Sequence, residues 1–120
     1  MFQTVAVVFL GGGIGSLARF GVTQIVKQFP ESSFPVATLV SNILACVIIG
    51  IALGYFTSRF SDGDLKNFVI VGICGGFSTF STFSLETLQL FRMGQTVFAV
   101  ANIGISVALC ILVLASFIRK

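Results

Sequence analysis

The sequence contains no histidine and no tryptophan, and only four of its 120 residues are acidic. Charged residues make up 9% of the chain, whereas a soluble domain carries about 25%. This scarcity of charge excludes an ordinary water-soluble domain. Because histidine is absent, a transition-metal site with the usual nitrogen and sulfur ligands is not expected either.

Cysteine is also scarce, and Cys46, Cys74 and Cys110 each lie inside an apolar stretch. An odd number of cysteines without a CxxC pair cannot form a complete disulfide framework. We therefore expect neither redox nor metal chemistry from these thiols.

Apolar residues dominate what remains, at 56% of the chain, with a mean hydropathy of +1.08. They form four blocks of about 20 residues or more, the length of helix that crosses a bilayer. The blocks lie at about 2–25, 36–56, 67–91 and 96–118. Pro30 and Pro35 fall between the first two, as expected of residues that disrupt helix interiors. The sequence thus predicts an all-α membrane protein whose residues 1–120 form one four-helix transmembrane domain.

The basic residues favour one orientation only weakly. With four spans, both termini and the second connection share a side of the membrane. That side carries Arg59, Lys66, Arg119 and Lys120, and the other carries Lys27 and Arg92, with Arg19 near a helix end. Basic residues in short loops normally set the orientation, and here the two sides carry nearly equal numbers of them. We therefore hypothesise insertion in both orientations and an antiparallel dimer. The alternative is a weak bias toward cytoplasmic termini.

Small residues recur four positions apart, in the pairs Gly11 and Gly15, Gly50 and Gly54, and Gly72 and Gly76. Such pairs let helix backbones approach closely in lipid. We expect all three pairs to lie at helix contacts.

The third span carries adjoining glycines, Gly75 and Gly76, each of which costs about 1 kcal/mol relative to alanine in a helix. The pair predicts a helix break, although a close helix crossing would also need two glycines. At membrane depth a broken helix frees backbone groups that commonly bind ions. The carbonyls of Gly75 and Ser78 are therefore candidates to hold a cation.

Hydroxyls and aromatic rings alternate after the glycines. The hydroxyl residues are Ser78, Thr79, Ser81, Thr82, Ser84 and Thr87, and the rings are Phe77, Phe80 and Phe83. Hydrogen bonds to the preceding turn would account for two or three of the hydroxyls. A regular helix would place the three rings, with Ser84 and Thr87, on one face about 120° wide. Positive ring edges and hydroxyl donors together suit an anion pathway with no deep trap, although an aromatic stripe usually serves packing.

Three other polar residues within the spans have two interpretations each. Asn42 offers amide donors to an anion, or makes an interhelical hydrogen bond. Arg19 draws anions to a vestibule, or extends to the membrane interface. Glu86 is the only acid inside a span and a candidate for proton-coupled export, or it is solvated or caps a helix near the span's end.

Three motifs together resemble the Fluc, or CrcB, family of fluoride channels along the whole chain. They are the run from Gly72 to Glu86, the stretch Gly11-Gly12-Gly13-Ile14-Gly15 followed by Arg19-Phe20, and Thr38-Leu39 followed by Asn42. The resemblance implies a channel and not an enzyme: a dual-topology antiparallel homodimer in the cell membrane. Each of its two pores would use both subunits and export toxic fluoride passively.

By position, Phe80 and Phe83 resemble the family's phenylalanine box and Asn42 its pore asparagine. The remaining expected fluoride-pathway residues are Ser81 and Thr82 of the polar track, with Thr38, Arg19 and Glu86. The resemblance further implies that the Gly75 and Ser78 carbonyls hold a structural sodium ion at the dimer interface.

The sequence departs from the common family pattern at four positions. Ala37 and Cys46 replace frequent glycines, Ser41 an aliphatic residue, and Cys110 a fourth-span serine of the outer polar track. A heterodimer of two related chains is therefore an alternative to the homodimer.

The rival function is that of a small proton-coupled four-helix exporter, which would need an acid in the first span, where this chain has none.

Overall fold

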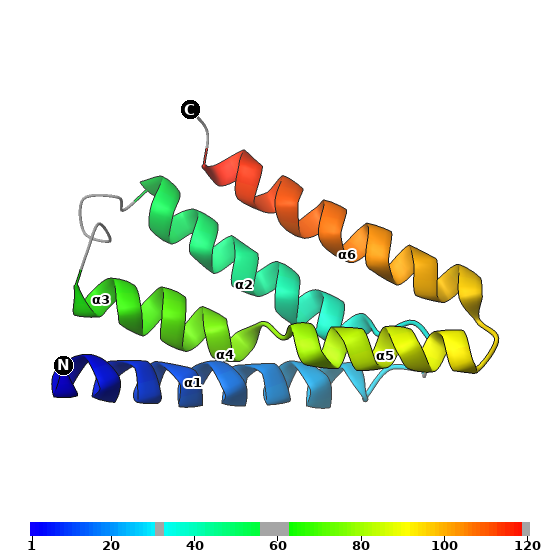
Figure 1. The fold of residues 1–120 in the computed structure, drawn as a ribbon, viewed down its shortest axis with the longest axis horizontal. Coiled ribbons are helices and arrows are strands. Elements are labelled where there is room, and N and C mark those ends of the chain that lie inside the picture. The colour runs from blue at the N-terminus through cyan, green and yellow to red at the C-terminus, as the bar shows by residue number, and fades with distance from the viewer. Residues whose placement is uncertain (31–32, 56–62, 119–120) are drawn as a thin grey trace.

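The structure is a computed structural model that describes residues 1–30, 33–55 and 63–118. Three helices run without interruption: α1 (Phe2–Val26), α2 (Val36–Tyr55) and α6 (Thr96–Phe117). The third helical segment consists of α3 (Asp64–Lys66), the π-helix η1 (Asn67–Cys74), α4 (Gly75–Phe77) and α5 (Phe80–Arg92) (Figure 1). The expected four-helix, all-α architecture is confirmed within the described residues, and the third segment begins at Asp64, a few residues earlier than expected.

Each of the four helical segments is long and apolar enough to cross a membrane. The start of α1, the end of α2, the start of α3 and the end of α6 lie toward one end of the bundle, and the opposite ends of the helical segments lie toward the other (Figure 1). Arg59, Arg119 and Lys120, on which the orientation argument partly depends, lie outside the described residues.

The turn between α5 and α6 is closed by Gly94, whose φ of 78° lies in the left-handed region that favours glycine. The N–H of Gln95 donates to the Leu90 carbonyl at 2.9 Å, and that of Gly94 donates to Phe91 at 3.1 Å. This pair of bonds is the Schellman arrangement that ends many helices. It lets α6 fold back along α5.

Helix α1 packs along η1 and α4 through glycines. A Cβ atom on Gly72 would lie 2.9 Å from the Gly11 Cα, and one on Gly76 would lie 2.5 Å from the Gly12 carbonyl oxygen. On Gly15 it would lie 2.8 Å from the Phe77 nitrogen. Only a residue without a side chain allows these backbones to come so close, so the predicted helix contact is confirmed.

Helix α2 packs along α6 in a similar way. A Cβ atom on Gly50 would lie 2.6 Å from the Phe117 ring, and one on Gly54 would lie 2.5 Å from the Phe117 carbonyl oxygen. The pair Gly50 and Gly54 therefore also lies at a helix contact, as expected.

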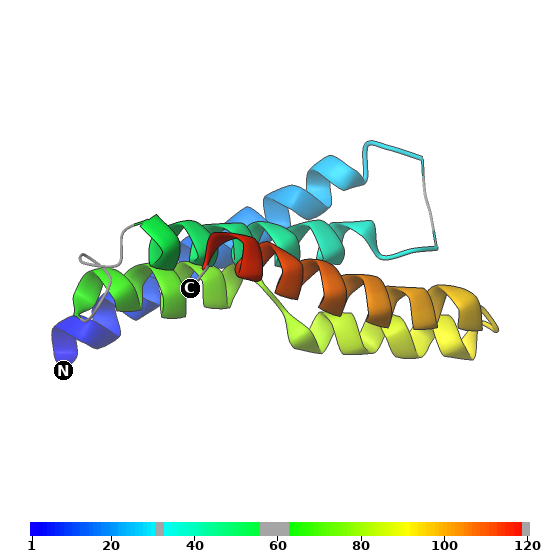
Figure 2. The same ribbon diagram turned by 90° about the horizontal axis from the view of Figure 1, so that it is seen from above.

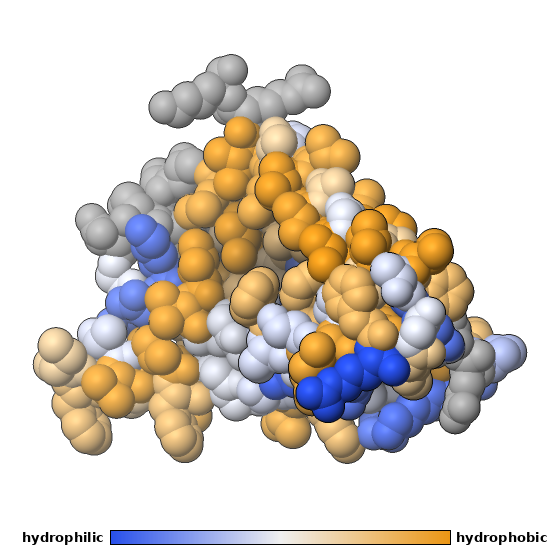
Figure 3. All heavy atoms as spheres, turned by 45° about the vertical axis from the view of Figure 1, so that its right-hand side comes forward, coloured by the Kyte–Doolittle hydropathy of each residue, from blue (hydrophilic) through white to orange (hydrophobic). Residues whose placement is uncertain are grey.

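The buried core is small. Its central cluster consists of Ala45, Cys74 and Phe77, one from each of α2, η1 and α4. Many large apolar side chains are exposed instead, and orange apolar atoms cover much of the face in Figure 3, with hydrophilic residues gathered in its lower part. Such apolar surface is not stable in water, and it fits a multi-pass membrane protein.

Helix α5 diverges from α1 (Figure 2). Among the described residues it packs against α6 and α2 but makes no contact with α1. One side of α5 thus has no neighbour among the described residues, and Leu85 and Leu88 are among its exposed residues.

Candidate functional site

Two extended residues separate α4 from α5. Ser78 has φ −85° and ψ 156°, and Thr79 has φ −153° and ψ 121°. Gly75, in contrast, is helical, with φ −62° and ψ −37°. The extended backbone therefore lies after the glycine pair, and the regular i→i−4 hydrogen bonds are interrupted at this point.

The side chain of Asn42 replaces part of the missing hydrogen bonding. Its Oδ1 accepts from the Thr79 N–H at 2.8 Å, and its Nδ2 donates to the Thr79 carbonyl at 3.4 Å. The amide thus binds both polar groups of one extended residue, as a neighbouring strand would. This is the interhelical hydrogen bond considered from sequence. It uses one of the two amide hydrogens of Asn42 and leaves the second for another acceptor.

Thr79 also caps α5. Its Oγ1 accepts from the Thr82 N–H at 3.2 Å and lies 3.3 Å from the Ser81 hydroxyl. An N-cap threonine satisfies one of the amides that the first turn of a helix leaves unpaired. Sequence reasoning did not assign this role to Thr79, although threonine before an amphipathic helical run is a known N-cap signal.

Backbone carbonyls at the end of α4 differ in their partners. The Gly76 carbonyl accepts from Arg19 Nε at 3.1 Å, so this arginine is tied to the third segment. The Cys74 carbonyl accepts from the N–H of Ser78 at 2.9 Å and from its hydroxyl at 2.8 Å. The carbonyls of Gly75 and Ser78 receive no hydrogen bond from the described residues. Unpaired carbonyl oxygens are ligands that suit a hard cation.

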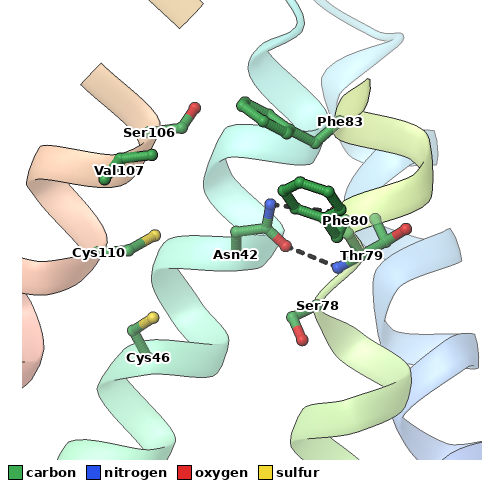
Figure 4. A pocket seen from close by; sticks show the side chains of 9 residues that line it. All are labelled: Asn42, Cys46, Ser78, Thr79, Phe80, Phe83, Ser106, Val107 and Cys110. Carbon is green, nitrogen blue, oxygen red and sulfur yellow. Dashed lines mark hydrogen bonds between the residues drawn. The ribbon is translucent and has the colours of Figure 1, made fainter. Parts of the chain in front are cut away.

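A pocket of about 260 Å³ opens beside the extended residues, between α2, the third segment and α6. Its lining consists of Asn42, Cys46, Ser78, Thr79, Phe80, Phe83, Ser106, Val107 and Cys110 (Figure 4). The Phe80 and Phe83 rings lie 5.7 Å apart with an interplanar angle of 39°. They stand beside the Asn42 amide (Figure 4). The pocket therefore combines aromatic rings, one amide and three hydroxyls with two thiols.

The three phenylalanines do not share one face, so that expectation is wrong. Phe77 is 6% exposed and belongs to the core, whereas Phe80 is 79% exposed. The reason is the extended backbone of Ser78 and Thr79, which changes the rotational phase between α4 and α5. A regular helical period cannot be continued across such residues.

The other expected pathway residues lie outside the pocket lining. Thr38 is buried in α2, Ser81 is exposed on α5, and Thr82 is half-buried. Arg19 lies on α1, and Glu86 lies further along α5. The Oε1 of Glu86 is buried without a hydrogen-bond partner among the described residues. The structure thus brings Asn42, Phe80 and Phe83 together in one pocket, whose lining does not include the remaining candidates.

A network of buried and partly buried hydrogen bonds joins α6 to α5 at the pocket wall. The Ser106 hydroxyl donates to Asn102 Oδ1 at 3.1 Å, and Asn102 Nδ2 donates to the Thr87 hydroxyl at 2.8 Å. Thr87 in turn donates to the Phe83 carbonyl at 2.7 Å. Each member of the network is satisfied, and such networks rigidify a core. This hydrogen-bond network therefore fixes the backbone of Phe83 against α6.

The sequence is similar to one known family along most of its length. The sequence profile of the family described as CrcB-like protein, Camphor Resistance (CrcB), matches residues 6–117. The chain belongs to the CrcB family. The match includes all four helical segments and every residue of the pocket.

Three CrcB relatives carry the same description, fluoride-specific ion channel FluC. The relative from Flavobacterium psychrophilum is 40% identical over 108 residues, which are 89% of this chain and 87% of the relative. The relative from Ruminiclostridium cellulolyticum is 44% identical over 89% of this chain and 83% of its own length. The relative from Rhodospirillum rubrum is 40% identical over 92% of this chain and 88% of its own length.

Proposed function

We propose that this CrcB protein is a fluoride channel that exports fluoride passively across the cell membrane and so relieves fluoride toxicity. The relatives' shared description supports the function. The observation that carries the proposal is the pair of rings, Phe80 and Phe83, standing 5.7 Å apart beside the Asn42 amide. Channel conduction requires no covalent chemistry, and the chain is accordingly not an enzyme.

Fluoride is small and strongly hydrated, so its passage requires groups that replace water. Ring edges carry partial positive charge, and the free amide hydrogen of Asn42 is a donor. Neither group carries a full charge, which allows the ion to be released as well as bound. Ser81 and Thr82 would continue this path as a polar track along α5, and the buried Thr38 hydroxyl of α2 would contribute to it.

Arg19 and Glu86 would act at the ends of the path. Arg19 is held at the Gly76 carbonyl, where its positive charge would attract anions toward the extended residues. The buried, unpaired Oε1 of Glu86 needs a donor from outside the described residues of this chain. A partner subunit would supply such a donor.

The pathway is completed by a second copy of the chain, in an antiparallel homodimer that forms because the protein inserts in both orientations. Phe80 is 79% exposed, although a ring that lines a pore must be enclosed. The side of α5 that α1 leaves uncovered offers the surface for this copy. Residues from both subunits would then line each of two pores.

A structural sodium ion would join the two subunits. The Gly75 and Ser78 carbonyls without partners fit a hard cation, and Gly75 is exposed. Two carbonyls are too few ligands for such an ion, so the same pair from the second copy would complete the site. Bound sodium would fix the extended residues and stabilise the dimer.

A small proton-coupled exporter is the rival, and proton coupling separates the two functions. Purified protein is reconstituted into fluoride-loaded vesicles, and release is measured with and without a proton-gradient uncoupler. A passive channel continues to release fluoride after the proton gradient has collapsed. Release that stops with the uncoupler would support the exporter and overturn the proposal.

Dual insertion has its own test, with two reporters fused in turn to the C-terminus. One reporter is active only on the cytoplasmic side of the membrane, and the other only on the opposite side. Dual topology predicts signal from both reporters. Signal from one reporter alone would exclude insertion in both orientations and leave a single orientation.

A further inference from the structure

Two of the three cysteines face the same pocket although they are 64 positions apart, since Cys46 lies on α2 and Cys110 on α6. Figure 4 shows both sulfur atoms directed into the pocket from the same side. The helices α2 and α6 pack along each other, and each contributes one of these thiols to the pocket wall. Both thiols are free and half-buried, so they remain accessible from the pocket.

The third thiol has a different position. Cys74 is buried in the core beside Ala45 and Phe77 and does not line the pocket. The chain therefore holds a pair of pocket thiols and a separate core thiol that serves as an internal control.

We propose that Cys46 and Cys110 form a two-thiolate site for a soft, thiophilic metal ion, and that an ion bound there blocks the pocket. Sulfur ligands select soft ions, and a d¹⁰ ion is satisfied by two thiolates in nearly linear coordination. No third ligand is required, which suits a pocket whose other side chains are an amide, hydroxyls and apolar groups. The blocking effect rests on the proposed fluoride pathway, but metal binding does not.

Mercury(II) is the probe whose charge best matches this site. Each thiol loses its proton to water, two S–Hg bonds form, and the two chlorides of HgCl₂ are released, with no change of oxidation state. The product is electrically neutral, so it carries no charge penalty at membrane depth. Since two protons are released on binding, affinity should rise with pH.

The position of the bound ion would obstruct the passage of fluoride. The site connects α2 to α6 beside Asn42 and Phe83, within a pocket of about 260 Å³. Mercury is soft and fluoride is hard, so the ion would fill the space without offering fluoride a favourable ligand.

The experiment uses the full chain, purified under reducing conditions and reconstituted into fluoride-loaded vesicles. Fluoride release is compared before and after HgCl₂ for wild type, Cys46→Ala, Cys110→Ser and the control Cys74→Ala. Native mass spectrometry counts mercury bound to each protein, which gives a readout independent of transport. Each variant is compared with its own release rate without mercury.

For wild type and Cys74→Ala we expect one mercury per chain and a block reversed by excess dithiol. Cys46→Ala and Cys110→Ser should each need at least about tenfold more mercury for the same block, because each loses one of two ligands. Equal sensitivity of all four proteins, or loss of block in Cys74→Ala alone, would overturn the proposal. If no vesicle releases fluoride, the proposed channel function fails, and the mass measurement alone decides whether the thiol pair binds metal.

Discussion

Asn42 holds Thr79 by both polar groups of its backbone, accepting from the N–H at 2.8 Å and donating to the carbonyl at 3.4 Å. A side chain of α2 thereby supports the extended backbone between α4 and α5. The same amide lies in the wall of the pocket. Asn42 thus both supports the backbone and forms part of the pocket wall, and substitutions at position 42 should affect stability and efflux together.

Asn42→Ala should abolish fluoride efflux and also lower the stability of the chain. It leaves two polar backbone groups of Thr79 without their partner, at about 1–3 kcal/mol for each group that stays buried. Asn42→Asp keeps the acceptor for the Thr79 N–H but places a negative charge in the anion path, so it should retain more stability and still lose efflux. Efflux and thermal unfolding in detergent measure the two effects. Leu44→Ala, at an exposed position of α2, is the control, and unchanged efflux in Asn42→Ala would contradict the assignment.

Phe80→Ile should abolish efflux with little effect on the fold of the single chain. The ring is 79% exposed and its centroid lies 5.7 Å from that of Phe83, so its replacement removes little buried packing among the described residues. Phe9→Ile is a matched control, because Phe9 is 77% exposed on α1. Vesicle efflux and cross-linking of dimers are measured for both. Equal efflux from the two variants would remove Phe80 from the pathway.

Gly76→Ala should destabilise the chain by about 1–3 kcal/mol, the usual effect of overpacking. The new methyl group would lie 2.5 Å from the Gly12 carbonyl oxygen and 3.0 Å from the Ser16 nitrogen, and neither backbone atom can move without shifting α1. In Gly104→Ala the new methyl group has no atom of the described residues within 4 Å, so this change should be neutral or stabilising by up to about 1 kcal/mol. Thermal unfolding in detergent separates the two, and equal unfolding temperatures would contradict the close helix contact.

Gly75→Ala should weaken the dimer while the single chain keeps its fold. Among the described residues, a Cβ atom on Gly75 would meet nothing nearer than the Ile70 carbonyl oxygen at 4.0 Å, so the expected clash is with the proposed partner. We expect at least about tenfold weaker dimerisation, or roughly 1.4 kcal/mol. Replacing sodium with potassium should weaken the wild-type dimer in the same direction. Fluorescence energy transfer between labelled chains in vesicles measures dimerisation in both experiments. If neither Gly75→Ala nor the exchange of sodium for potassium weakens the dimer, the result would argue against the sodium site.

Much of the fold follows from the sequence because it depends on local composition. Apolar stretches of helix length predict four membrane-crossing helices, and glycines four residues apart predict close helix contacts. Both expectations depend on spacing along the chain, and both are confirmed.

The details of the site depend on contacts between distant segments and are therefore not predictable from spacing. Extended backbone occurs at Ser78 and Thr79, and not at the glycine pair, where Asn42 from another helix supplies hydrogen bonds. Once the backbone is extended, helical periodicity no longer relates Phe77 to Phe80. The meeting of Cys46 with Cys110 likewise depends on how α2 and α6 are rotated against each other, which composition does not determine.

The most direct measurement is fluoride release from vesicles that contain the purified protein, followed with a fluoride electrode under a steep outward gradient. Chloride-loaded vesicles of the same preparation are the control. Rapid fluoride release, with chloride retained, is expected if the rings of Phe80 and Phe83 and the Asn42 amide line a fluoride path. If vesicles with the protein retain as much fluoride as protein-free vesicles, this account of the pathway is contradicted.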